Sequence, residues 1–118
     1  MSGINKVILI GHLGENPDLR RLADNITVSS FPLATTEMQT KDGERVEVTE
    51  WHNIVMWRGM AESAGRLLHK GDLVYIEGKL RTRSFVDKAG VRKAVTEIMT
   101  ENFVALSKTT DLAEIAEE

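Results

Sequence analysis

The chain has 118 residues, 42% of them apolar and 28% charged, which are ordinary values for a single globular domain. It has no cysteine, which excludes disulfides and cysteine-based zinc sites, and its three histidines lack ligand-like spacing, so we expect neither metal nor cofactor. The N-terminal apolar stretch is too short for a signal peptide or membrane span, so we expect a cytoplasmic protein without membrane contact.

The first half of the chain predicts three strands. Residues 4–14 (INKVILIGHLG) are rich in β-branched side chains and close with glycines, as a bending first strand would. Residues 25–37 (NITVSSFPLATTE) alternate weakly, and Pro32 disfavours a central position for that part of the second strand. Asp42-Gly43 indicates a hairpin turn, after which residues 45–57 (RVEVTEWHNIVMW) alternate as a long third strand.

The second half predicts a helix and two more strands. The apolar positions of the helix fall at helical spacing before the stop signal Gly71, and they are Met60, Ala61, Ala64, Leu67 and Leu68. Residues 72–85 (DLVYIEGKLRTRSF) alternate, 87–90 (DKAG) form a hairpin tip, and 91–107 return as a last strand. The alternation of that last strand slips near Ile98-Met99, which suggests a bulge.

Five strands with one short helix between strands three and four predict an all-β OB-fold, a five-stranded Greek-key barrel often used for oligonucleotides. The net charge of −3 does not exclude nucleic acid, because charge is unevenly distributed. Residues 51–108 carry 10 basic and 6 acidic side chains, whereas residues 109–118 carry four acidic and no basic ones. Local patches rather than the total decide the partner.

Both tryptophans of the chain lie on the third strand. Trp51 and Trp57 share one face with Asn53, while Ile54 and Met56 occupy the other and favour the core. The spacing alone leaves two interpretations open: buried core aromatics on a curved strand, or an exposed platform that stacks on a flat molecule such as a nucleobase.

The fourth strand interleaves cations with an aromatic ring. One face would carry Val74, Ile76, Gly78 and Leu80, and the other Tyr75, Glu77, Lys79, Arg81, Arg83 and Phe85. A run of charges is usually a solvated face. Together with the two tryptophans, however, it matches the needs of a single strand, in which cations follow phosphates and rings stack on bases.

The segments "GINKVILIGHLG", "TEWHNIVMW", "HKGDLVYIEGKLRTRSF" and "TEI" resemble the bacterial single-stranded DNA-binding protein family, over residues 3 to about 106. The resemblance implies an OB-fold domain over residues 1–108 that assembles as a homotetramer, has no catalytic activity, and binds single-stranded DNA in replication, recombination and repair. By position it implies stacking roles for Trp51, Trp57 and Phe85 and a subunit-interface role for His52. The mixed character of Tyr75 and Glu77 adds them to the expected interface.

The chain departs from the family pattern at two places on the expected DNA path. Where the family commonly has a further tryptophan, this chain has Met38 and Gln39, which implies that one stacking site is lost or weakened. Asn53 stands where an arginine often follows "EWH", which weakens one phosphate contact, although we keep Asn53 as a DNA-binding candidate. The cations we expect at phosphates are Lys79, Arg81 and Arg83, with Lys6 and Arg58 in addition and Lys41 and Arg45 as possible replacements.

The family typically continues into a flexible linker and an acidic tip that ends in proline and phenylalanine and recruits replication and repair enzymes. This sequence instead ends in "TTDLAEIAEE", so such partners are expected without the usual tip, and residues 109–118 form a short acidic segment. With Thr110 or Asp111 as an N-cap, a short helical turn is an alternative to a tail. Whether the chain is naturally short or cut at the domain edge stays open.

Two other classes of function remain to be weighed. An enzyme is disfavoured because no nucleophile motif, phosphate loop or cluster of metal-ligating residues accompanies His52 and Glu50. An adaptor resembling the primosomal relatives of this family would use the same fold chiefly to hold other replication proteins. Such an adaptor would respond weakly to single-stranded DNA.

Overall fold

The computed structural model describes residues 2–107, and the predicted acidic segment 109–118 lies outside the described residues. The described part holds one α-helix, one short 3-10 helix at Ala23–Asn25 and six strands. In chain order these elements are β1 (Val7–Leu13), β2 (Asp18–Arg21), β3 (Thr27–Lys41), β4 (Glu44–Trp57), α1 (Arg58–Leu67), β5 (Leu73–Val86) and β6 (Arg92–Ser107).

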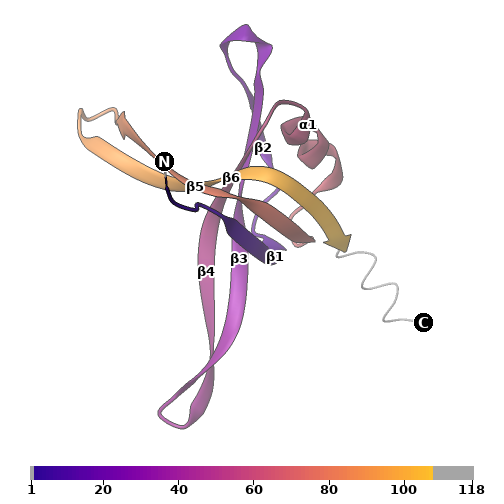
Figure 1. Cartoon of the computed structure of the whole chain (residues 1–118), viewed down its shortest axis with the longest axis vertical. Coiled ribbons are helices and arrows are strands. Elements are labelled where there is room, and N and C mark those ends of the chain that lie inside the picture. The colour runs from indigo at the N-terminus through magenta and orange to yellow at the C-terminus, as the bar shows by residue number, and fades with distance from the viewer. Residues whose placement is uncertain (1, 108–118) are drawn as a thin grey trace.

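Five of the strands close into a ring. The sheet order is β1-β5-β6-β4-β3-β2, and an additional pairing between β1 and β3 joins its two sides. Neighbours are antiparallel except β4 and β6, which pair in parallel at Ile54–Ile98 and Val55–Met99. The helix lies between β4 and β5 in the chain and packs against β3 and β4, as Figure 1 shows. This arrangement confirms the predicted OB-fold.

The short strand β2 was not predicted. Its sequence DLRR has four exposed residues and no apolar alternation, so it carries no strand signal of its own. It forms because β3 offers a free edge, along which Asp18 pairs with Ser30 and Arg21 with Thr27. As a result, the helix follows the fourth strand of the chain rather than the third.

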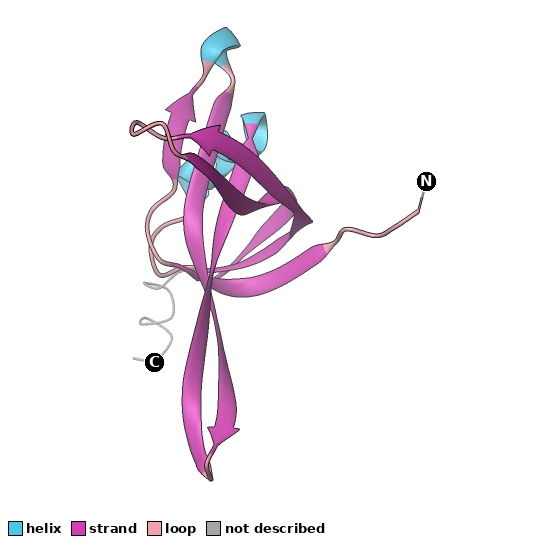
Figure 2. Cartoon of the chain, turned by 90° about the vertical axis from the view of Figure 1, so that its left-hand side faces the viewer, coloured by secondary structure: helices cyan, strands magenta, loops and turns pink. Residues whose placement is uncertain are grey.

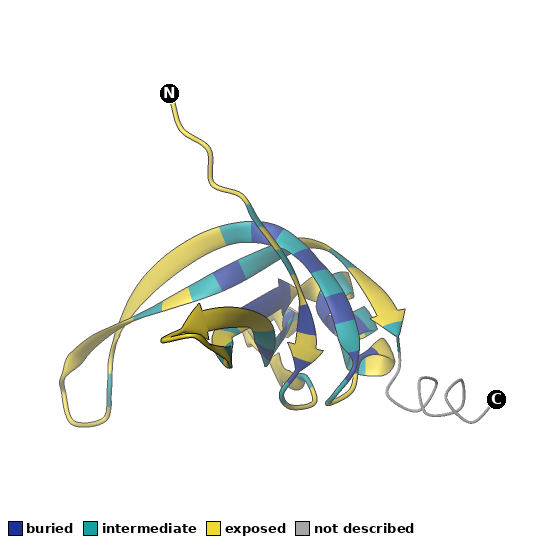
Figure 3. Cartoon of the chain, turned by 90° about the horizontal axis from the view of Figure 1, so that it is seen from below, coloured by how far each residue is buried: buried dark blue, intermediate teal, exposed yellow. Residues whose placement is uncertain are grey.

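Two hairpins extend beyond the ring, from β3–β4 and from β5–β6. The β3–β4 hairpin points downward in Figures 1 and 2, and the β5–β6 hairpin points to the left in Figure 1. The predicted tip Asp42-Gly43 is confirmed as a two-residue turn with φ of 52° and 82°, the left-handed geometry that suits tight hairpins. Figure 3 shows that both hairpins are exposed, whereas burial concentrates where the strands cross.

The core fills the ring and the space beneath α1. Its buried members are Leu13, Phe31, Leu33, Ile54, Met56, Ala61, Ala64, Leu68, Val74, Ile76 and Ile98. Two apolar positions of the predicted helix and fourth strand lie outside this core. Leu67 is exposed because the buried stripe of α1 runs through Ala61 and Ala64 to Leu68, and Leu80 is exposed because β5 has left the ring at that point.

Proline and bulge positions refine the predicted strands. Pro32 lies on β3 where one edge is free, since β2 covers that edge up to Ser30 and β1 covers it from Leu33. The Pro32 carbonyl accepts a hydrogen bond from the Gly14 amide at 2.9 Å across this gap, so the missing N–H faces away from β4. The bulge predicted near Ile98-Met99 instead lies at Glu101, where the register with β5 shifts.

Candidate nucleic-acid interface

The outward face of β4 carries both indoles. Trp51 is 60% exposed and Trp57 is 40% exposed, whereas Ile54 and Met56 between them are fully buried in the core. The predicted assignment of the two faces is therefore confirmed, and the interpretation of both tryptophans as core residues is wrong. Val55 shares the outward face but is buried, and it lines both of the surface hollows on this face.

The ring of Trp51 is positioned by the loop after β1. A Cβ atom at Gly14 would lie 2.5 Å from Cζ3 and 2.8 Å from Cη2 of the indole, so a larger residue at position 14 would displace the ring. The same point lies 3.3 Å from Cγ of Pro32. Trp51 is thus held at one edge by Gly14 beside Pro32 and remains open elsewhere.

Two adjacent hollows lie along this face of the sheet. The Arg81 hollow has a volume of about 610 Å³ and is lined by Arg20, Leu22, Val28, Ser30, Val55, Trp57, Arg81, Arg83, Glu97 and Met99. The structure therefore brings Trp57 together with two of the predicted cations. It adds Arg20, which sequence reasoning missed because β2 was not predicted; the Arg20-Arg21 pair was the available signal.

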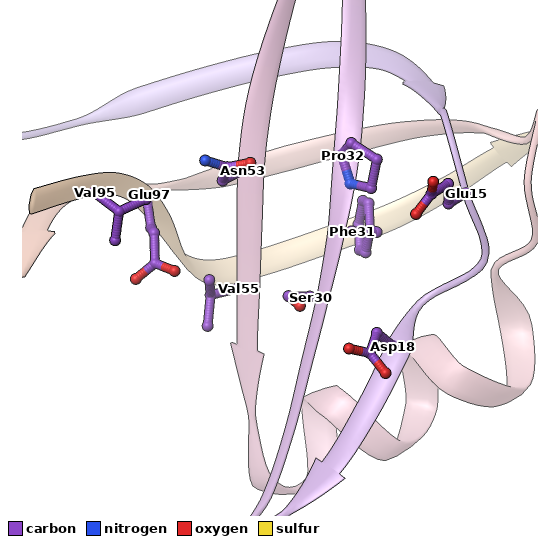
Figure 4. Close-up of a pocket in the computed structure, with 9 residues that line it drawn as sticks. All are labelled: Glu15, Asp18, Ser30, Phe31, Pro32, Asn53, Val55, Val95 and Glu97. Atoms are coloured by element: carbon purple, nitrogen blue, oxygen red, sulfur yellow. The ribbon is translucent and has the colours of Figure 1, made fainter. Parts of the chain in front are cut away.

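The Asn53 hollow has a volume of about 320 Å³. Two of its lining residues, Asn53 and Val55, lie between Trp51 and Trp57 along β4. It is lined by Glu15, Asp18, Ser30, Phe31, Pro32, Asn53, Val55, Val95 and Glu97. Figure 4 shows Glu15 and Asp18 on one side and Glu97 on the other, with Ser30 and Val55 between them. The two hollows share Ser30, Val55 and Glu97, so they form one continuous surface.

Arg83 is held by groups of its own chain. Its Nε donates to Glu97 Oε1 at 3.0 Å, and its Nη2 donates to Oε2 at 3.4 Å. The Arg83 guanidinium carbon also lies 5.5 Å from the centroid of the half-exposed Phe85 ring, within the range of a cation–π contact. Glu97 therefore already balances the charge of a residue that we predicted to bind phosphate.

The other predicted cations differ in how free they are. Within residues 2–107, Lys79, Arg81 and Arg58 make no ion pair. Arg58 follows Trp57 directly and has a φ of 59°, a left-handed conformation that is strained for a residue with a side chain. Lys6 lies in neither hollow, because its amino group donates to Glu77 Oε1 at 3.1 Å on another part of the surface.

The predicted interface residues are only partly brought together. The Tyr75 hydroxyl donates a hydrogen bond to Glu77 Oε2 at 2.8 Å, and this bond raises the pKa of Tyr75. The same bond, together with Lys6, lowers the pKa of Glu77. His52 lies on β4, which pairs with neither β1 nor β5, and its Nε2 is 2.8 Å from the Thr35 hydroxyl.

The described residues hold no group of three or more metal-ligating side chains that could bind an ion. Among residues 2–107, no helix has the length and apolar character needed to cross a membrane.

Comparison with known proteins identifies the chain's relatives. The model of the Single-strand binding protein family matches residues 4–106. A single-stranded DNA-binding protein of Bacteroides thetaiotaomicron is 44% identical over 107 residues, which cover 88% of this chain and 66% of the relative. Proteins of the same name from Neisseria meningitidis serogroups A and B are 45% identical over 97 residues, covering 81% of this chain and 56% of the relatives.

A solved structure described as a Plasmodium falciparum SSB complex with ssDNA superposes with a TM-score of 0.81 at 31% identity. The match covers 91% of this chain and 98% of that chain. The chain spans 66% or less of the length of the Bacteroides and Neisseria relatives. It belongs to the Single-strand binding protein family.

Proposed function

We propose that this member of the Single-strand binding protein family binds single-stranded DNA by base stacking and phosphate contacts, with little sequence preference. The observation that carries the proposal is the pair of exposed indoles, Trp51 and Trp57, on a sheet face that also presents Arg81. Stacking on an aromatic ring tolerates every base, and the cations follow the backbone. Relatives named for single-stranded DNA binding support the same function.

In this proposal the side chains divide into stacking groups and phosphate ligands. Trp51, Trp57 and Phe85 stack on bases because each ring is at least 40% exposed on or beside the hollows. Arg81, Lys79 and Arg58 bind phosphates, since no carboxylate of residues 2–107 neutralises them. Lys6 and Arg83 contribute less than their charge suggests, because Glu77 and Glu97 already pair with them.

Tryptophan fluorescence tests the proposal, because both indoles of the chain lie on the proposed DNA path. Titration with poly(dT) should quench the emission strongly and saturably, whereas duplex DNA of equal phosphate concentration should quench it weakly. An adaptor with the same fold would bind poly(dT) weakly and show little quenching. Cleavage of a labelled oligonucleotide in the presence of magnesium would instead favour an enzyme.

We also propose that the protein assembles as a homo-oligomer, and specifically as a homotetramer. From Val7 to Gly11 one edge of β1 has no partner strand within residues 2–107, and an open edge can pair with a second chain. On the adjoining face, Ile8 and Ile10 are exposed opposite Glu77 and Tyr75. Light scattering should give four chain masses of 13.2 kDa, and a single species at that chain mass would refute assembly.

The proposed biological setting is DNA replication, recombination and repair, in which exposed single strands need protection. We place this activity in the bacterial cytoplasm at the nucleoid, because the Bacteroides and Neisseria relatives are bacterial proteins named for binding single-stranded DNA. The role is binding rather than catalysis. Replication and repair enzymes are proposed partners.

A further inference from the structure

The Asn53 hollow differs from its neighbour in the charges that line it. No basic side chain contributes to its lining, which includes the carboxylates Glu15, Asp18 and Glu97. The Arg81 hollow next to it contains three arginines and only one of these carboxylates. A phosphate therefore finds cations in the Arg81 hollow but none in the Asn53 hollow, where the carboxylate of Glu15 repels it. A single strand crossing this face would turn bases, rather than backbone, toward the Asn53 hollow.

Within this hollow, Glu15 is the carboxylate that remains available to a ligand. The Asp18 carboxylate accepts a hydrogen bond from Arg20 at 3.1 Å, and the Glu97 carboxylate accepts one from Arg83 at 3.0 Å. Glu15 makes no hydrogen bond or ion pair with any side chain of residues 2–107. The Asn53 amide at the opposite side of β3 is likewise without a partner in that part of the chain, so the hollow offers two polar groups.

A stacking surface lies next to these groups. Glu15 follows Gly14, against which the Trp51 ring packs, and Pro32 beside that ring also lines the hollow. The volume of about 320 Å³ lies at the lower end of the range for small-molecule sites, roughly 300–1,000 Å³. A base stacked near Trp51 would therefore present its edge to Glu15 and Asn53.

The two groups treat base edges differently. The Asn53 amide carries both donors and an acceptor, so it can turn to suit any base. The Glu15 carboxylate accepts hydrogen bonds, which suits the exocyclic amino group of cytosine, whereas thymine and uracil present a carbonyl oxygen there. We propose that the Asn53 hollow is a base-edge site in which Glu15 favours cytosine over thymine. The inference rests on the proposed single-strand binding.

Matched oligonucleotides isolate this preference. Single strands of 5-methylcytosine and of thymine share the methyl group and differ at the amino or carbonyl position that Glu15 would read and at the adjacent ring nitrogen N3. At slightly alkaline pH, where cytosine stays neutral, the protein should bind the 5-methylcytosine strand roughly fivefold or more tightly, within the range for discrimination by one side chain. Cytosine and uracil strands should give the same order without the methyl group.

Glu15→Gln should bring this affinity ratio close to one, because the amide can donate to the thymine carbonyl as well as accept. Glu47→Gln, which removes the same charge from the exposed β3–β4 hairpin, should leave the ratio at its wild-type value. The exposed position of Glu15 makes unchanged melting temperatures the expected folding control. A wild-type ratio near one, or a ratio that survives Glu15→Gln, would overturn the base-edge site while leaving single-strand binding intact. Failure to bind either strand would overturn both proposals.

Discussion

Replacing Glu97 by glutamine should strengthen the binding of single strands and steepen its dependence on salt. In the native chain the Glu97 side chain is only 14% exposed and holds Arg83 through two contacts of 3.0 and 3.4 Å. A phosphate must compete with this carboxylate for the guanidinium. Glutamine keeps one acceptor oxygen but removes the charge, so the Arg83 cation becomes available to the backbone of the strand.

The size of the effect follows from the number of proposed phosphate ligands that make no ion pair. Lys79, Arg81 and Arg58 have no ion-pair partner among residues 2–107, so three phosphates can be neutralised per chain. Each contributes about −0.7 to the slope of log K against log salt, which gives about −2.1 for the native protein. Release of Arg83 should shift the slope to about −2.8 per chain.

Fluorescence titrations with poly(dT) above about 0.1 M salt measure both slopes. At that ionic strength the Debye length is about 10 Å, so distant charges are screened. Glu47→Gln changes the net charge equally on the β3–β4 hairpin and should keep the native slope. Equal slopes for the native protein and Glu97→Gln would show that Arg83 already binds phosphate despite its partner, and would refute this reasoning.

Three further outcomes are expected. Trp51→Ala and Trp57→Ala should each weaken poly(dT) binding by about 1–3 kcal/mol without lowering the melting temperature, since exposed rings stack but add little to the core; loss of stability with normal binding would contradict the platform. Arg58→Gly should relieve left-handed strain of about 1–2 kcal/mol, seen as a higher melting temperature, and should flatten the salt slope by about 0.7. Backbone hydrogen bonds, above all the one from Val91, lower the pKa of Asp87 below its ordinary value of 3.8. The ionised Asp87 therefore contributes its full stabilisation above pH 3.8, and this stabilisation is lost as the pH falls through the lowered pKa. Asp87→Asn should therefore reduce the loss of unfolding free energy at acid pH, measured over a pH series. An unchanged pH dependence would show that Asp87 does not contribute to this loss.

The parity of strand residues explains why the outward placement of the two tryptophans was predictable. On β4, Ile54 and Met56 both fill the core, which fixes Trp51 and Trp57 outward whatever the register with neighbouring strands. The hairpin tip at Asp42-Gly43 was predictable for a similar reason, because it depends on local backbone preferences.

Properties that depend on partners across strands could not be derived in this way. The register of β5 and β6 sets Arg81 directly opposite Glu97. Arg83 lies two residues further along the same face of β5, so it reaches Glu97 diagonally across the two strands. The Asn53 hollow needs Glu15 from the loop after β1, close to Asp18 on a strand that has no signal of its own. Such contacts join residues far apart in the sequence, so their positions follow only from the closed ring.

The acidic net charge is compatible with DNA binding because Asp18 and Glu97 on the proposed DNA path are paired with arginines, and the hairpin carboxylates lie farther away. At about 3.3 Å per strand residue, Glu47 is about 13 Å and Glu44 about 23 Å along β4 from Trp51. At 0.1 M salt both exceed the Debye length, but at 0.01 M that length reaches about 30 Å and the hairpin repels the strand. Plots of log K against log salt should therefore bend downward from the linear trend at low salt. A Glu44→Gln/Glu47→Gln double variant should restore linearity there while matching the native protein above 0.1 M, and identical curves throughout would exclude this repulsion.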